Sequence, residues 1–399
     1  MTLSQARVLQ VIDSLSVKRG GPPASAVATA LALRHEGFNN EFAYVFRPDE
    51  VNDTDQYRSV LASAGVPVYA FPVSTVWDSG ARRWGLSTDF ARWLAKHVHE
   101  YDVIHAHGAW TFTALWSLVA ARASRRKVFL STRESLTNFD RAKSPVWDRA
   151  VKRAGRFVFM RAFHRVILAS RLEQVDSADR TRLHSTVVPH AVRRVAGPAA
   201  VGSSSQDRVV VGFLSRLHPK KNLETVIDSL LYLDQRYELH VAGNGEPAYV
   251  AALHQRAREL RVDHRIRWLG FLTGEQRQRF LEQTDVLAVP SAYEGFGVAA
   301  VEALGAGVPV LVSPTVGVAD VVEEFGCGVV VPPTAEAVAA GLMSLADSVD
   351  REGLTVRAHR AASLFSLEAH GAALRRVYGC DEPVHRVMAT QPPSLGGDR

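Results

Sequence analysis

Two glutamates in the second half of the chain have a spacing that suits an extended, sugar-containing ligand. Glu294 stands in a loop with Gly295 and Gly297, and Glu302 follows inside the alanine-rich, proline-free segment 298–306. This pattern predicts a helix that begins near Gly297 and presents unpaired N–H groups to an anion. An ionised carboxylate only accepts hydrogen bonds, and a sugar diol donates two. Glu302 therefore suits a ribose, and Glu294 suits a transferred hexose.

Two basic residues upstream could hold the anionic part of the same ligand. Arg216 and Lys221 follow an apolar run that is typical of a buried strand. A guanidinium and an ammonium group can together neutralise a diphosphate without a metal ion. Asn222 can cap the next helix, whose predicted apolar face is Leu223, Val226, Ile227 and Leu230. The pattern predicts a phosphate site at this strand-to-helix junction. The turn with Gly243 and Gly245 lacks the rest of a dinucleotide motif, and we interpret it as a strand-ending turn.

The first half contributes polar residues at the ends of predicted strands. His105 and His107 alternate in an apolar run, so they share one face of a strand, with His107 at its carboxyl end. Ligands collect at that end of parallel sheets. We expect His105 to be a hydrogen-bonded core residue. Arg133 follows another such run and could hold an anionic acceptor, hold a donor phosphate, or pair with the adjacent Glu134.

Strand-like and helical runs alternate in both halves of the chain, which predicts two α/β domains, each with a parallel sheet covered by helices. Two domains of ordinary size also suit a chain of 399 residues. The expected organisation is a first domain, a linker rich in Ala, Gly and Ser, a second domain, a helix that crosses back to the first domain, and a disordered tail: 1–195, 196–207, 208–366, 367–383 and 384–399.

The charge is concentrated in one segment. Residues 122–165 hold 13 Lys and Arg against three acidic residues, whereas the whole chain has a net charge of +6. A helix beginning at Pro145 could lie on an anionic membrane, or it could face the core with its basic side in water. No nucleic-acid motif accompanies the charge. Two cysteines and no signal peptide or membrane-spanning run indicate a cytoplasmic protein, with peripheral attachment to the inner face of the membrane as a hypothesis.

The two site segments resemble a known family. "DVLAVPSAYEGFGVAAVEALGAGVPV", residues 285–310, is similar to the E-x7-E signature of the retaining glycosyltransferases of family 4, the glycosyl transferases group 1. "FLSRLHPKKNLETVIDSL", residues 213–230, is similar to their GRL-x-P-x-KG element, with Asn222 in place of the usual glycine. The resemblance implies the GT-B fold, in which two Rossmann-like, doubly wound domains face a central cleft. It also implies an acceptor-binding first domain and a nucleotide-sugar-binding second domain.

The resemblance implies roles for individual residues. The catalytic candidates are Arg216, Lys221, Glu294 and His107. The donor-binding candidates are Gly20, Gly21, Arg216, Lys221, Glu294, Gly295, Phe296, Gly297, Val298 and Glu302. On the acceptor side the candidates are His107 and Arg133, although many family members have histidine where this chain has Arg133 and glycine where it has Glu134.

The implied function is a retaining hexosyltransferase of polysaccharide biosynthesis. It would move a sugar from a UDP- or GDP-type donor to a hydroxyl of a glycan, a lipid-linked glycan or a small molecule. No cofactor or metal is expected, because the one D-x-D pattern, Asp53 and Asp55, lies in a polar loop typical of solvated surface. Two alternatives stay open. A sugar-nucleotide epimerase of the same fold would convert sugars without an acceptor, and a non-catalytic carbohydrate-binding protein would not release nucleotide.

Overall fold

The computed structural model describes residues 6–74, 85–139, 161–177, 184–192 and 208–379. Three of the sequence-based predictions concern other residues. The linker at 196–207, the tail at 384–399 and the helix from Pro145, within the basic segment 122–165, lie outside the described residues.

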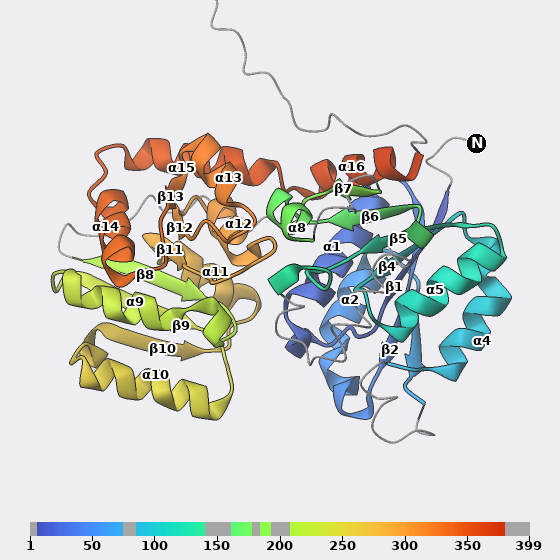
Figure 1. Cartoon of the computed structure of the whole chain (residues 1–399), viewed down its shortest axis with the longest axis horizontal. Coiled ribbons are helices and arrows are strands. Elements are labelled where there is room, and N and C mark those ends of the chain that lie inside the picture. Colours follow the sequence, from blue (N-terminus) through green and yellow to red (C-terminus); the bar gives the residue numbers. More distant parts are fainter. Residues whose placement is uncertain (1–5, 75–84, 140–160, 178–183, 193–207, 380–399) are drawn as a thin grey trace, which may run out of the picture.

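The first lobe is built on a parallel sheet of seven strands in the order β3-β2-β1-β4-β5-β6-β7 (Figure 1). Its strands are β1 (Arg7–Ile12), β2 (Asn39–Phe46), β3 (Val68–Pro72), β4 (Val103–His107), β5 (Lys127–Ser131), β6 (Arg165–Leu168) and β7 (Ser185–Val187). Its helices are α1 (Gly21–His35), α2 (Asp55–Ser63), α4 (Thr88–His97), α5 (Phe112–Ala123) and α8 (Arg171–Asp176), with 3-10 turns η2 (Val17–Arg19), η3 (Pro48–Asp53) and η4 (Val98–Glu100).

The second lobe is built on a parallel sheet of six strands in the order β10-β9-β8-β11-β12-β13. Its strands are β8 (Val209–Leu214), β9 (Tyr237–Ala242), β10 (Ile266–Gly270), β11 (Val286–Val289), β12 (Val310–Val312) and β13 (Gly328–Val330). Its helices are α9 (Leu223–Ser229), α10 (Pro247–Glu259), α11 (Gly274–Glu282), α12 (Val298–Gly305), α13 (Ala319–Phe325), α14 (Ala335–Ala346) and α15 (Arg351–Ser363), with 3-10 turns η5 (Pro219–Lys221), η6 (Leu230–Tyr232) and η7 (Asp263–Arg265).

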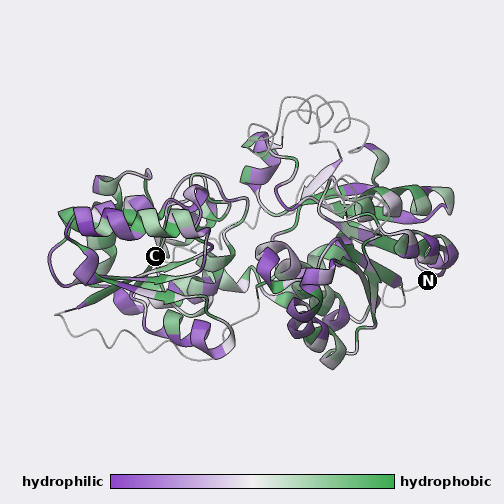
Figure 2. Cartoon of the chain, turned by 90° about the horizontal axis from the view of Figure 1, so that it is seen from below, coloured by the Kyte–Doolittle hydropathy of each residue, from purple (hydrophilic) through white to green (hydrophobic). Residues whose placement is uncertain are grey.

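Apolar strands place the core inside each lobe. Every residue of β8 and β11 is buried, as expected for parallel strands covered by helices on both faces. Figure 2 shows the hydrophobic residues concentrated in the sheets, with hydrophilic residues along the outer helices. The strand order reverses between β1 and β4 and again between β8 and β11. Ligands of such sheets bind at the carboxyl ends of the strands at this reversal.

The last helix of the described chain, α16 (Leu367–Gly379), packs against the first lobe (Figure 1). Gly371 permits the close approach to α1, since a Cβ there would lie 2.7 Å from the Ala32 carbonyl oxygen. The Arg375 Nε donates to the Glu36 carboxylate over 2.8 Å. A helix that follows the second lobe in sequence thus contributes to the core of the first.

Candidate active site

Lys221 is positioned by a short turn that is fastened to the loop after β11. It is the last residue of η5, which follows β8. The side-chain amide of Asn222 donates to the Pro290 carbonyl over 3.2 Å and so fixes this turn beside the end of β11, the neighbour of β8 in the sheet. The Lys221 Nζ then lies 2.8 Å from the Glu294 carboxylate. Folding therefore joins two site residues that are far apart in sequence.

The prediction that the Asn222 side chain caps α9 is wrong. Asn222 occupies the N-cap position, but its side chain accepts no hydrogen bond from the helix backbone. Its Oδ1 instead accepts from the Thr225 hydroxyl over 2.9 Å. The φ angle of Asn222 is +58°, a left-handed conformation in which glycine is unstrained and asparagine is tolerated. The predicted apolar face of the helix is confirmed, because all four of its residues are buried.

Backbone hydrogen bonds fix the orientation of Glu294. Its N–H donates to the Thr315 carbonyl over 2.9 Å, and its carbonyl accepts from the Gly317 N–H over 2.8 Å. The Ser291 hydroxyl donates to its carboxylate over 3.1 Å. The Lys221 and Glu294 side chains are only 16% and 14% exposed. The ion pair is thus partly shielded from water, where charges interact more strongly than at an open surface.

The loop after Glu294 forms the predicted helix start. Gly297 is the N-cap residue of α12, with a φ of +104°. A Cβ at Gly297 would lie 2.9 Å from Val316 Cγ1, so a larger residue would be strained and crowded. The Phe296 ring is buried against His190 and Phe365, with centroid distances of 5.0 and 5.3 Å. Only the backbone of Phe296 is therefore positioned to meet a ligand. Val298 packs partly buried against the same core.

Glu302 has a partner that the sequence did not reveal. Arg277 of α11 donates from Nε to its carboxylate over 2.7 Å. Burial raises the pKa of Glu302, and Arg277 opposes that shift. Arg277 thus engages one carboxylate oxygen, Oε2, and no hydrogen bond joins the other oxygen to the residues that the structure describes.

Arg216 stands between β8 and the η5 turn that carries Lys221. It follows β8, is exposed, and makes no hydrogen bond or ion pair within the part of the chain that the structure describes. The neighbouring glycine turn has a structural role, as predicted. A Cβ at Gly243 would lie 1.8 Å from the Ser215 carbonyl oxygen, and one at Gly245 would lie 2.2 Å from that of Leu217. Lys221 and Glu294 thus form a pair, whereas no hydrogen bond or ion pair among the described residues joins Arg216 or Glu302 to either of them.

In the first lobe, Arg133 is bound by two histidines. Its Nη2 donates to His107 Nδ1 over 2.7 Å, and its Nη1 donates to His190 Nδ1 over 2.8 Å. Burial lowers the pKa of Arg133 to about 9 and holds the pKa values of both histidines well below their usual range. Neutral histidines can accept from a guanidinium, and His107 can donate from Nε2 to the Gln10 side-chain oxygen that it contacts. His190 and Gln10 carried no signal in the sequence.

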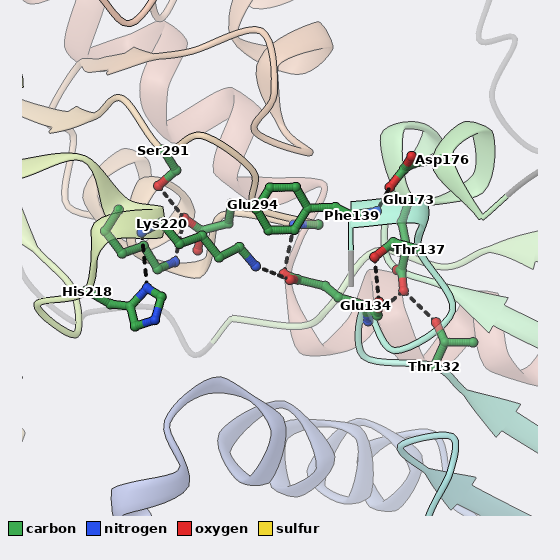
Figure 3. A network of polar contacts seen from close by, with 12 residues as sticks. Thr132, Glu134, Thr137, Phe139, Glu173, Asp176, His218, Lys220, Ser291 and Glu294 are labelled. Atoms are coloured by element: carbon green, nitrogen blue, oxygen red, sulfur yellow. Dashed lines mark hydrogen bonds and ion pairs between the residues drawn. The ribbon is translucent and has the colours of Figure 1, made fainter. Parts of the chain in front are cut away.

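The alternative pairing of Arg133 with Glu134 is wrong. The Glu134 carboxylate reaches the second lobe instead, where one oxygen lies 2.5 Å from Lys220 Nζ and the other accepts from the Gly295 N–H over 2.7 Å (Figure 3). Both Arg133 and Glu134 have positive φ angles, +53° and +67°, which turn the two side chains to different neighbours. The contact of Glu134 with Lys220 could not be inferred from spacing, because 86 residues separate them.

His105 is a core histidine, as predicted. Its Nδ1 is 2.6 Å from the Tyr378 hydroxyl, and its Nε2 is 2.8 Å from the Ser131 hydroxyl. Its ring stacks on that of His107 with centroids 4.3 Å apart, so the two share one face of β4. Burial lowers the pKa of His105 well below its usual range.

The glycine pair near the amino terminus is exposed at the start of α1. Gly20 is the N-cap residue with a φ of +78°, and a Cβ at Gly20 or Gly21 would meet no atom within 4 Å. The amino end of α1 is therefore open to an anion. The D-x-D residues are separately paired on the surface, Asp53 with Lys18 over 3.0 Å and Asp55 with Arg58 over 3.3 Å.

Comparison with known proteins matches both lobes. Residues 200–354 match the family model of glycosyl transferases group 1, and residues 20–191 match that of the glycosyl transferase 4-like domain. The chain is 30% identical over 146 residues to an uncharacterized glycosyltransferase of Methanocaldococcus jannaschii, an alignment that spans 36% of this chain and only 37% of that protein. It is 27% identical over 316 residues to D-inositol 3-phosphate glycosyltransferase of Salinispora arenicola, spanning 71% of this chain and 70% of the relative.

Solved structures share the arrangement of both lobes. The crystal structure of Anabaena HepE in complex with UDP and glucose superposes with a TM-score of 0.74 at 20% identity, covering 93% of this chain and 99% of HepE. This likeness confirms the GT-B fold that the sequence predicted. With a matching family model on each lobe, the chain belongs to the group 1 glycosyltransferases.

Proposed function

We propose that the chain transfers a sugar from a nucleoside diphosphate sugar to an acceptor hydroxyl with retention of anomeric configuration and without a metal ion. The observation that carries this proposal is the Lys221–Glu294 pair, 2.8 Å apart at the carboxyl ends of β8 and β11. A cation for a phosphate and a carboxylate for sugar hydroxyls stand side by side there. Glu294 also stands three residues before Gly297, the N-cap residue of α12, and the amino end of a helix favours an anion.

The donor would extend across the second lobe. Lys221 and the exposed Arg216 would bind the diphosphate, and the free oxygen of Glu302 would accept from the ribose. Glu294 would orient the hydroxyls of the transferred sugar beside the backbone of 295–298. A UDP-type donor is the better supported of the two types, because HepE, which has the same fold, was crystallised with UDP-glucose.

The reaction would break the bond between the sugar C1 and the phosphate oxygen and form a bond from C1 to the acceptor oxygen on the same face. The acceptor proton would pass to the departing phosphate oxygen. Lys221 and the amino end of α12 would stabilise the negative charge that develops on that phosphate. On the acceptor side, His107 and Arg133 would face the sugar from the first lobe.

The acceptor proposed is a glycan or lipid-linked glycan hydroxyl, reached from a cytoplasmic position beside an anionic membrane. Leu115 and Val119 of α5 are 50% and 47% exposed, and Arg122 follows them on the same helix. Such a surface suits peripheral binding to anionic lipid. Within the described ranges, no helix combines the length and apolar character needed to cross a bilayer. Co-sedimentation with anionic but not neutral vesicles is the expected result, and equal binding to both would contradict this proposal.

The test of function is a donor screen. UDP- and GDP-sugars are compared for thermal stabilisation, since a ligand of the folded state raises its stability. The best donor is then assayed for transfer and for hydrolysis, with and without EDTA, and the anomeric configuration of the product is read by NMR. Retention and insensitivity to EDTA are expected. Conversion of the donor sugar without acceptor would indicate an epimerase, and binding without nucleotide release would indicate a non-catalytic protein.

A further inference from the structure

We propose that Glu134 is a positioning residue for the sugar-transfer reaction. It would fasten the first lobe to the loop that carries Glu294 and so hold that carboxylate in its working orientation. The proposal rests on the proposed function, because it assigns Glu294 to the transferred sugar. Many members of the family have glycine where this chain has Glu134.

Side chains of the first lobe hold both backbone polar groups of Gly295. The Glu134 carboxylate accepts from the Gly295 N–H over 2.7 Å, and the Ser170 hydroxyl donates to the Gly295 carbonyl over 2.5 Å. Both polar backbone groups of this second-lobe residue are thus bound by side chains of the first lobe. Gly295 directly follows Glu294, so fixing its two peptide groups limits the orientations open to the Glu294 side chain.

Glu134 is itself held firmly. Its N–H donates over 2.8 Å to the Glu173 carboxylate, which also accepts from the Thr132 hydroxyl over 2.5 Å (Figure 3). The same carboxylate accepts from the Ala169 N–H over 2.7 Å. Three donors converge on this one buried carboxylate. The backbone of Glu134 is therefore fixed to the first lobe, and the hydrogen bond from its carboxylate holds Gly295 at a set position relative to that lobe.

A cation and two aromatic rings complete the contact. Lys220 Nζ lies 2.5 Å from the Glu134 carboxylate and 5.3 Å from the ring centroids of Phe139 and Tyr293. These two rings, one from each lobe, stack with centroids 4.8 Å apart. The Lys220 and Glu134 side chains are 18% and 33% exposed. An ion pair shielded by rings in this way contributes more than an exposed one.

Glu134 and Gly295 fit each other sterically. A Cβ at Gly295 would lie 2.5 Å from Glu134 Cγ, so the carboxylate reaches the N–H only because residue 295 has no side chain. Lys221, Arg216 and Glu302 all belong to the second lobe, and within the described ranges no hydrogen bond or ion pair joins Glu134 to any of them. Loss of Glu134 should therefore impair turnover, which needs both lobes together, and leave nucleotide binding by the second lobe intact.

The experiment compares Glu134→Ala with Glu134→Gln. The alanine variant is expected to lower kcat by roughly 10- to 100-fold, the order of effect that misplacement of a reacting group produces. The glutamine variant keeps an oxygen that can accept from Gly295 and is expected to recover most of that loss. The Kd for UDP, measured by calorimetry, should stay within about threefold of wild type in both. Glu100→Ala is the control, since Glu100 is ion-paired and 34% exposed but lies before the amino end of β4, whereas Glu134 follows the carboxyl end of β5.

Hydrogen exchange provides a readout that does not require activity. The amide of Gly295 should be protected in the wild-type chain and in Glu134→Gln, and it should exchange faster in Glu134→Ala. Gly295→Ala should lower kcat as Glu134→Ala does, and the two substitutions combined should cost less than the sum of the two.

An alanine variant with wild-type kcat would overturn the proposal. So would one that binds UDP more tightly, because the carboxylate would then be a competitor of the donor. Unchanged exchange at Gly295 in Glu134→Ala would overturn it as well. If the wild-type chain binds no nucleoside diphosphate sugar, the proposed function fails, while the exchange result still decides whether Glu134 holds the loop.

Discussion

Replacing Lys221 by methionine removes one positive charge and keeps most of the side-chain volume. At 2.8 Å from Glu294, the gross attraction is about 6 kcal/mol for an effective dielectric constant of about 20. Desolvation offsets much of this, and a hydrogen bond to a charged group contributes about 1.5–3 kcal/mol net. We expect UDP to bind roughly 10- to 150-fold more weakly to Lys221→Met.

Turnover should fall further than affinity. If Lys221 exchanges Glu294 for the departing phosphate, it acts where charge develops, and losing one such group typically costs about 10²–10³ in kcat. The variant should also lose about 1–3 kcal/mol of unfolding free energy, because Glu294 keeps only the Ser291 hydroxyl within the described residues.

The assays are calorimetric titration with UDP, steady-state kinetics with the best donor, and urea unfolding. Lys96→Met is the control, since Lys96 is an exposed lysine in the last turn of α4. The double variant with Glu294→Gln separates stability from function. It should regain part of the lost stability and none of the lost turnover, because the unpaired carboxylate is gone and the cation is still missing. A kcat/KM of Lys221→Met within threefold of wild type would refute the reasoning.

Three other predictions follow from the second lobe. Burial raises the pKa of Glu302 above its ordinary value of 4.5. Between pH 4.5 and the raised pKa, the folded chain therefore holds a proton that the unfolded chain releases. The free energy of unfolding falls as the pH rises through that window. Glu302→Gln should remove this component in urea unfolding measured at several pH values; a difference from wild type that does not change with pH would contradict it. Arg277→Leu should raise the pKa of Glu302 further, because Arg277 opposes the shift. As the pH falls, UDP-sugar affinity should then be lost at a higher pH than in wild type. An unchanged calorimetric pH profile would argue against Glu302 as the ribose acceptor. Gly297→Ala should cost about 1–3 kcal/mol of unfolding free energy, because φ is +104° and the new Cβ would lie 2.9 Å from Val316, whereas Gly305→Ala, which meets nothing within 4 Å, should be neutral or stabilising.

The sequence alone was sufficient for the elements and the fold class. Apolar runs and glycine positions follow local rules, so β8, which precedes Arg216, and the start of α12 at Gly297 lie where the pattern predicted them. The same rules place His105 and His107 on one face of β4. The family resemblance added the GT-B arrangement, which spacing alone does not specify.

Only the tertiary structure decided which side chains meet. Glu134 was considered as a partner of its neighbour Arg133, yet it contacts Lys220 and Gly295 of the other lobe. Arg277 beside Glu302 was likewise not foreseen. The physical reason is that hydrophobic periodicity shows which face of a segment is buried, and this can be read from that segment alone. A hydrogen bond between lobes depends on the direction of individual side chains after both sheets have packed, and positive φ angles at Arg133 and Glu134 changed those directions locally.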